Sequence, residues 1–121
     1  MLIDGSRFKQ VIMITGYTDV RKGIDGLANI IKYVYEMDPF EKEVLYIFCG
    51  RNKRKIKGLV WEGDGFVLLS KRLEGKDCRF KWPRNSEEAR ALTHQQLQWL
   101  MTGLTIDLKP TVSQIEHQLT I

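Results

Sequence analysis

The sequence predicts an α+β fold in which one long helix packs on a four-stranded antiparallel meander, with a short N-terminal strand and a C-terminal helix added. Three patterns lead to this prediction: a helical apolar stripe over residues 20–36, four strand-like runs within residues 44–82, and a helix-start signal at Thr93. Because the chain has 121 residues, 43% of them hydrophobic, we expect a single domain over residues 1–121.

The first elements are a strand and the long helix. Residues 11–15 form a short apolar run typical of a strand. Asp19 then stands where it can cap a helix over roughly residues 20–36, whose apolar residues recur at helical spacing. The helix is expected to end before Asp38, because a residue that precedes a proline disfavours helical backbone.

The meander is expected to contain strands at residues 44–49, 54–62, 66–73 and 78–82. Gly63–Phe66 has the pattern of a two-residue hairpin with Asp64 and Gly65 at its tip. That turn pairs Val60 with Leu69 and so fixes which side chains share a face. One face then carries the residues expected to pack under the long helix, among them Ile56, Val60 and Leu69.

The other face of the predicted meander carries cations. Lys57, Arg72 and Arg79 are expected in one row across three strands, with Lys55, Lys81 and Trp61 nearby. Like charges opposed across strands cost about 0.2–1 kcal/mol per pair. A phosphate backbone would relieve that repulsion and release counterions. The alternative interpretation is that these long side chains extend into water and are screened by salt.

The distribution of charge along the sequence also suggests a surface that binds an anion. The net charge is +4, but residues 51–82 alone contain ten Lys and Arg against four Asp and Glu. Such a concentration is typical of a surface that binds a polyanion, and also of a solvated face kept basic for solubility.

A second candidate anion site lies at the start of the predicted long helix. Arg21 and Lys22 are placed in its first turn, beside two glycines, where free backbone N–H groups and cations suit an anion. The alternative is that Asp19 and Asp25 pair with these bases.

The last predicted helix starts at Thr93, which forms a capping-box pair with Gln96, and ends near Gly103. The tail after residue 105 has little pattern.

Several classes of protein are disfavoured. Neither a signal peptide nor a membrane span is evident, and the cysteines read as reduced core residues, so a cytoplasmic protein is expected. No two candidate zinc ligands have the spacing of a ligand pair; the candidates are Cys49, Cys78, His94 and His117. Neither a phosphate-binding glycine loop nor a nucleophile elbow occurs, so no metal, cofactor or enzymatic activity is predicted.

Several motifs in order resemble a known family. They are TGYTDVRKGIDGL at 15–27, DPF at 38–40, FCGRNKR at 48–54, IKGLVWEGDGFVLLSKRLEG at 56–75, RFKWP at 79–83, and the spacing of LTHQQLQWLMTG at 92–103. Together they resemble the TnpB (Orf2) accessory proteins of IS66-type bacterial insertion sequences. The likeness covers about residues 11–105 and leaves the first ten residues and the tail 106–121 unmatched. It implies a short protein without an active site, encoded beside a larger DDE transposase that it assists and that is its expected partner.

The leading hypothesis is a non-catalytic subunit that binds or positions DNA for the transposase. Its expected phosphate contacts are Arg21, Lys22, Arg51, Lys53, Arg54, Lys55, Lys57, Arg72, Arg79 and Lys81. The alternative is an adaptor that binds the transposase without touching DNA, through a patch made of Leu59, Trp61 and Leu68. A nuclease is the third hypothesis and would need several acids converging on a metal.

Overall fold

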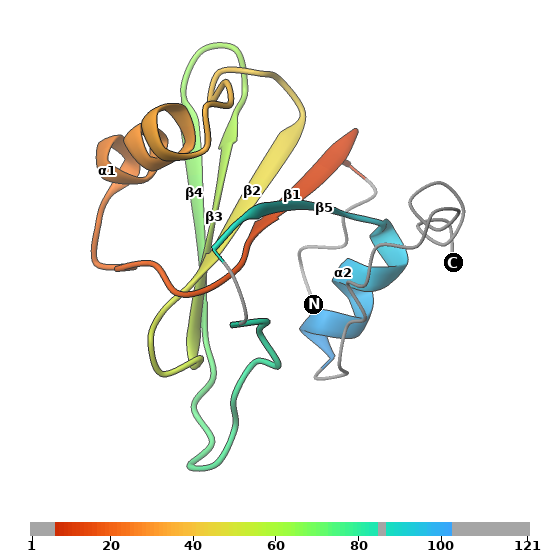
Figure 1. Ribbon diagram of the computed structural model, residues 1–121. Coiled ribbons are helices and arrows are strands. Elements are labelled where there is room, and N and C mark those ends of the chain that lie inside the picture. The colour runs from red at the N-terminus through yellow and green to blue at the C-terminus, as the bar shows by residue number, and fades with distance from the viewer. Residues whose placement is uncertain (1–6, 85–86, 103–121) are drawn as a thin grey trace.

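The computed structural model describes residues 7–84 and 87–102, which form a five-stranded mixed sheet with helices on both faces (Figure 1). The strand order is β4-β3-β2-β1-β5. The strands are β1 (Gln10–Ile14), β2 (Val44–Cys49), β3 (Lys55–Trp61), β4 (Phe66–Arg72) and β5 (Ala89–Leu92). The helices are α1 (Ile24–Asn29), which continues as the π-helical turn η1 (Ile30–Val34), and α2 (His94–Met101). The α+β class is therefore confirmed, while the arrangement of the strands differs from the meander.

The centre of the sheet is a parallel pair. β1 and β2 run in the same direction, with Val11 beside Leu45, and α1 and η1 form the crossover between them. β2 pairs antiparallel with β3, and β3 with β4, whereas β5 pairs antiparallel with β1 at the other edge. All six residues of β2 are buried, as expected for a strand that is covered on both faces.

Two apolar clusters fill the two sides of the sheet. On one side Leu27 and Ile31 of the crossover helix pack against inward residues of the strands, including Ile12, Tyr46 and Leu59. On the other side Leu97 and Leu100 of α2 and the chain around Phe80 and Trp82 pack against residues that include Met13, Ile47, Ile56 and Val60.

The prediction that the long helix covers the face with Ile56, Val60 and Leu69 is therefore wrong. These residues belong to the cluster under α2, and it is Leu59, fully buried, that packs with the crossover helix. The helix connects two parallel neighbours and therefore has to cover one face of the sheet, and the handedness of such a crossover, which the strands at residues 44–82 do not reveal, decides which face it covers.

The long helix is also shorter than expected. It begins at Ile24 after Gly23, which makes no side-chain cap, so Asp19 is not the capping residue and Arg21 and Lys22 precede the first turn. It ends in the π-helical turn η1, where the Tyr35 amide donates to the Ile30 carbonyl at 3.3 Å.

The β3–β4 hairpin is confirmed, but its register is offset by two residues. Trp61 pairs with Phe66, and the Glu62 amide donates to the Gly65 carbonyl at 2.9 Å, so the tip is Gly63 and Asp64. Gly63 has φ +99, which glycine adopts without penalty and which a type II′ hairpin requires at its first tip position. An offset of two residues leaves every side chain on its expected face.

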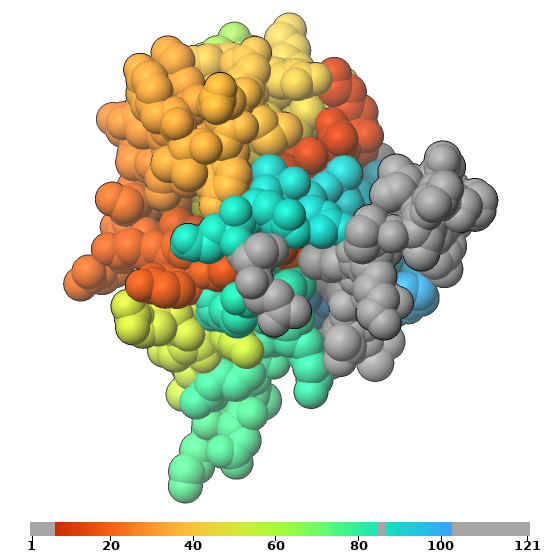
Figure 2. Space-filling view, in the orientation of Figure 1, coloured from red at the N-terminus to blue at the C-terminus, as the bar shows by residue number. Residues whose placement is uncertain are grey.

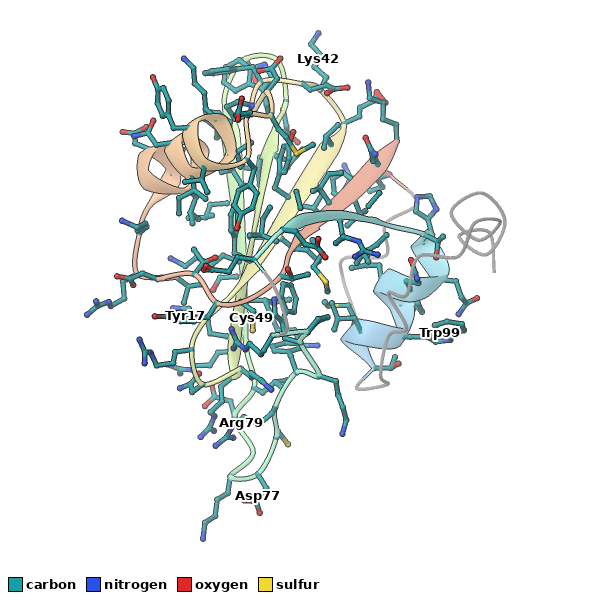
Figure 3. The ribbon with its side chains drawn as sticks, viewed as in Figure 1. Tyr17, Lys42, Cys49, Asp77, Arg79 and Trp99 are labelled. Carbon is teal, nitrogen blue, oxygen red and sulfur yellow. The ribbon has the colours of Figure 1, made fainter. Side chains whose placement is uncertain are left out.

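Residues 78–82 do not form the fourth strand of a meander. The Phe80 amide donates to the Lys53 carbonyl at 2.7 Å, and the Trp82 indole donates to the Ile14 carbonyl at 3.1 Å. The two aromatic side chains are therefore buried beneath the sheet without a ladder to β4. The chain between β4 and Phe80 projects from the body of the molecule, with Asp77 near its tip (Figures 2 and 3).

The C-terminal helix is confirmed in detail. The Thr93 hydroxyl accepts from the Gln96 amide, and the Gln96 side chain accepts from the Thr93 amide, both at 2.9 Å. The tail after residue 102 lies outside the described residues. Within the described ranges, no helix has the length and apolar character needed to cross a membrane.

The packing around Gly58 gives a testable prediction of stability. A Cβ atom at Gly58 would lie 3.0 Å from Leu45 Cδ1, in a core where Leu45 is fully buried. We expect Gly58→Ala to lower the free energy of unfolding by about 1 kcal/mol through overpacking. Gly65→Ala is the matched control, because an added Cβ there has no neighbour within 4 Å. Urea denaturation of both variants measures the difference, and equal stabilities would contradict the packing.

Candidate nucleic-acid interface

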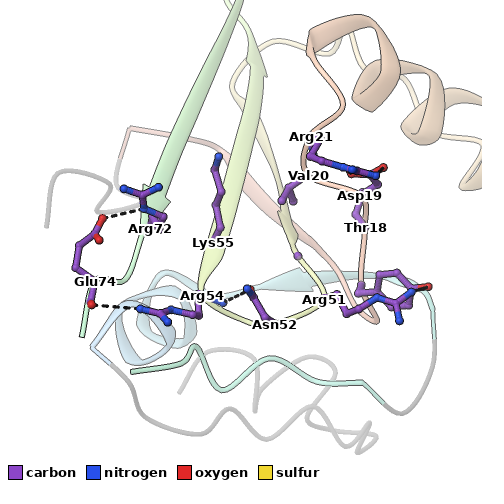
Figure 4. A pocket seen from close by; sticks show the side chains of 12 residues that line it. Thr18, Asp19, Val20, Arg21, Arg51, Asn52, Arg54, Lys55, Arg72 and Glu74 are labelled. Carbon is purple, nitrogen blue, oxygen red and sulfur yellow. Dashed lines mark hydrogen bonds and ion pairs between the residues drawn. The ribbon is translucent and has the colours of Figure 1, made fainter. Parts of the chain in front are cut away.

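The loops that follow β1 and β2 meet the ends of β3 and β4 at one end of the sheet and line an open groove of about 950 Å³ (Figure 4). β1 and β2 are parallel, so their carboxyl ends, and the loops that follow them, lie at the same end of the sheet. The groove is lined by Tyr17, Thr18, Asp19, Val20, Arg21, Gly50, Arg51, Asn52, Arg54, Lys55, Arg72 and Glu74.

The loop after β1 is anchored by its buried threonines. The Thr15 hydroxyl donates to the Glu88 carbonyl at 3.2 Å and accepts from the Glu88 amide at 2.9 Å. The Thr18 amide donates to the Cys49 carbonyl at 2.8 Å, which ties this loop to the end of β2. Tyr17, between the two threonines, is left exposed on the wall of the groove.

Asp19 and Arg21 form a local turn on the same wall. Asp19 Oδ1 accepts the Arg21 backbone amide at 3.1 Å, and the carboxylate accepts from Nε and Nη2 of the Arg21 guanidinium at 2.9 and 3.0 Å. These hydrogen bonds from Arg21 lower the pKa of Asp19 to about 2 and raise that of Arg21. The alternative interpretation, that Asp19 pairs with a neighbouring base, is therefore correct for Arg21.

Arg84 joins the two loops from the side of the core. Its guanidinium donates to the carbonyls of Gly16 and Gly50, and to that of Arg51 at 3.2 Å. Arg51 in turn donates to the Tyr17 hydroxyl at 2.7 Å and lies over its ring at 4.5 Å. The role of Arg84 cannot be predicted from the sequence, because no local pattern marks an arginine that binds backbone carbonyls.

Cys49 lies behind these loops and is not poised as a nucleophile. Burial raises the pKa of its thiol to about 11, and Arg84 and Lys53 offset only part of this effect. Within residues 7–84 and 87–102, no three His, Cys, Asp or Glu side chains are grouped so that they could hold a metal ion. His117, one of the zinc candidates considered, lies outside the described residues.

The opposite wall of the groove is formed by strand ends. Lys55 of β3 lies directly opposite Arg72 of β4, and Arg72 Nε pairs with Glu74 Oε2 at 2.8 Å. Arg54 instead donates to the carbonyls of Leu73, Glu74 and Gly75 at 3.2, 3.2 and 3.0 Å. Arg54 therefore holds the end of β4 in place, although it borders the groove.

The structure brings together five of the ten predicted phosphate contacts: Arg21, Arg51, Arg54, Lys55 and Arg72. The other five do not line the groove: Lys22, Lys53, Lys57, Arg79 and Lys81. The expected row of three cations does not form, because the register offset places Lys57 opposite Ser70. Arg79 lies outside the sheet, where its guanidinium donates to the Cys78 carbonyl at 2.8 Å and to the Lys76 carbonyl at 3.3 Å.

The prediction that Leu59, Trp61 and Leu68 form a continuous exposed patch is wrong. Leu59 is fully buried, and Leu68 is half-buried against the cluster under α1. Trp61 is half-buried and contacts Phe40 and Phe66.

Comparison with known proteins gives the family. The family described as IS66 Orf2 like protein matches residues 9–110. Two uncharacterized proteins of Sinorhizobium fredii are similar. Protein y4hO is 34% identical over 104 residues, covering 86% of this chain and 87% of its own length. Protein y4jC is 24% identical over 103 residues, covering 85% of this chain and 86% of its own. No solved structure gives a significant match. Because the family match spans most of the sequence, the chain belongs to the IS66 Orf2 like family, the TnpB accessory proteins of IS66-type insertion sequences.

Proposed function

We propose that this protein is a non-catalytic transposition accessory protein that binds DNA through phosphate contacts in the groove and positions it for a separate transposase. Three separate segments of the chain each contribute a cation to one groove. These cations are Arg21, Arg51 and Arg72, and their convergence is the main support for the proposal. The same proposal places the protein in the bacterial cytoplasm, where the DNA of the element lies.

The opposed pair at the strand ends supports an anionic ligand. Lys55 and Arg72 face each other across β3 and β4, an arrangement that disfavours folding slightly. Within the described residues, no hydrogen bond or ion pair engages the Lys55 ammonium group. A phosphate between the two side chains would relieve the repulsion and release condensed counterions.

The two carboxylates in the groove do not prevent this binding. Asp19 is paired with Arg21 and Glu74 with Arg72, and both pairs are exposed to solvent. Exposed pairs of this kind add little stability, so a phosphate can replace the carboxylate as the partner of a guanidinium. Arginine is suited to the exchange, because its planar fork fits both groups. Contacts to phosphates position a protein on DNA without reading sequence, so we expect binding with little sequence preference.

A charge-matched comparison tests the groove. Lys55→Gln together with Arg72→Gln removes two cations that we expect to meet phosphates. Each phosphate contact adds about 0.9 to the slope of log affinity against log salt for duplex DNA. The slope should therefore decrease by between one and about two units. Salt titration of a fluorescent duplex by anisotropy measures it.

The control is Lys32→Gln together with Lys42→Gln, which removes the same charge outside the groove. This control should retain the wild-type slope, and all three proteins should have similar melting temperatures. If both double variants lose the same amount of slope, the binding reflects net charge, and the groove is not the site.

For Arg84 we expect a loss of stability without a change in DNA binding. Arg84→Gln leaves the carbonyls of Gly16, Gly50 and Arg51 without their donor. We expect the free energy of unfolding to fall by about 2 kcal/mol, since hydrogen bonds to charged groups contribute roughly 1.5–3 kcal/mol. The salt slope of DNA binding by the folded variant should not change, because Arg84 does not line the groove. Urea denaturation and salt titration check both statements.

Arg21→Gln is the matched control for Arg84, because 89% of its side chain is exposed. It should keep the wild-type stability and lose salt slope. A stable Arg84 variant with a reduced slope would show that Arg84 contacts phosphate and is not a scaffold residue.

A further inference from the structure

An aromatic cluster lies at the end of the sheet opposite the groove. The ring centroids of Phe40, Trp61 and Phe66 are 4.9–5.3 Å apart. Phe40 is 51% exposed, while Trp61 and Phe66 are half-buried, so the cluster has an open apolar face. In Figure 3 Lys42, two residues after Phe40, lies at this end of the molecule, and Tyr17 and Arg79 lie toward the other end.

Two hydrogen bonds hold the turn that carries Phe40. Asp38 Oδ1 accepts the Phe40 amide at 2.9 Å, and the Asp38 carbonyl accepts from the hydroxyl of the buried Tyr46 at 2.9 Å. Pro39, between Asp38 and Phe40, is buried. The Phe40 ring is therefore held at the surface by its own backbone anchors, although burying it would favour folding.

The two segments that carry the aromatic cluster are rich in carboxylates. Segments 36–43 and 61–66 contain six acidic residues and one lysine, and Lys9 of the chain before β1 pairs with one of the acids, Glu41, at 3.1 Å. The two segments are adjacent, since the backbones of Lys42 and Trp61 form an isolated parallel β-bridge. All six acids are exposed: Glu36, Asp38, Glu41, Glu43, Glu62 and Asp64. Their field repels a nucleic acid and attracts a cationic partner.

The spread of these carboxylates indicates the size of that partner. No three of them are grouped closely enough to hold a metal ion within the described part of the chain. They are spread over the same two segments as the aromatic rings, and protein interfaces commonly combine an apolar centre with polar residues at its margin. This arrangement fits an extended ligand with several cations better than a single ion.

We propose that this acidic aromatic end is a docking surface for an arginine- and lysine-rich segment of a partner polypeptide. An arginine of that segment stacks on the exposed Phe40 ring beside Trp61, and flanking cations pair with the carboxylates around it. A basic peptide satisfies both the aromatic face and the acidic rim, which neither DNA nor an apolar peptide does.

The surface is separate from the groove. β3 runs from Lys55 in the groove to Trp61 in the cluster, so the two sites lie about 20 Å apart at the rise of a β-strand. This separation exceeds the screening length of about 8 Å at physiological salt. DNA and the basic segment can therefore be bound at the same time.

The test uses a fluorescein-labelled peptide of alternating Arg and Gly, and the same peptide with citrulline, the neutral isostere, in place of each Arg. Anisotropy should show saturable binding of the arginine peptide only. Phe40→Ala should weaken it about threefold, the size of an exposed cation–π contact. Glu62→Gln with Asp64→Asn should weaken it about threefold as well, through two surface ion pairs. Circular dichroism checks that each variant is folded.

The groove variant Lys55→Gln/Arg72→Gln separates this proposal from the proposed function. It should bind the peptide as the wild type does, while Phe40→Ala should bind duplex DNA as the wild type does. The docking proposal is overturned by equal affinity for the citrulline peptide, by no saturable binding to the wild type, or by full affinity in both surface variants. Loss of DNA binding in the folded Phe40→Ala protein would also overturn it, since that end would then belong to the DNA surface.

Discussion

The parallel pairing of β1 with β2 is the constraint on which the rest of the molecule depends. It requires a crossover, which places α1 on one face of the sheet and leaves the other face to α2 and the aromatic residues Phe80 and Trp82. It also brings the carboxyl ends of both strands to the same end of the sheet, so that loops 15–23 and 50–54 meet there. The groove and its cations follow from this pairing, because residues of both loops line the groove.

The features that the sequence predicts correctly are those set by interactions between residues close together in the chain. The Thr93 capping box and the β3–β4 hairpin were both evident, because a side-chain cap and a glycine turn act within a few residues. The sequence leaves the position of the hairpin tip ambiguous, because Gly63 and Gly65 flank the same aspartate and either glycine suits a two-residue turn. The face covered by the helix was beyond prediction for a different reason. β2 is apolar on both sides, so its sequence does not indicate which side receives which helix.

The candidate site was predictable in its charge and not in its geometry. An excess of cations in residues 51–82 located the basic region, but it did not separate side chains that bind the protein from those left for a ligand. Arg54 and Arg84 bind backbone carbonyls, which any arginine can do and which no sequence spacing reveals. Residues 78–82 alternate between apolar and charged side chains as a strand does, and this pattern places Arg79 on a strand. Burial of Phe80 and Trp82 from an irregular segment gives the same alternation.

The separation of opposite charges along β3 explains why the molecule does not neutralise itself. A basic groove and an acidic rim joined by a flexible linker would collapse onto each other, and each would then compete with the other's ligand. A strand paired on both sides is stiff, and β3 lies between β2 and β4, so the two ends are held beyond the screening length. On the two proposals made above, binding at one end neither blocks nor requires binding at the other. The protein would then raise the local concentration of a basic partner near DNA by geometry alone, without a conformational change.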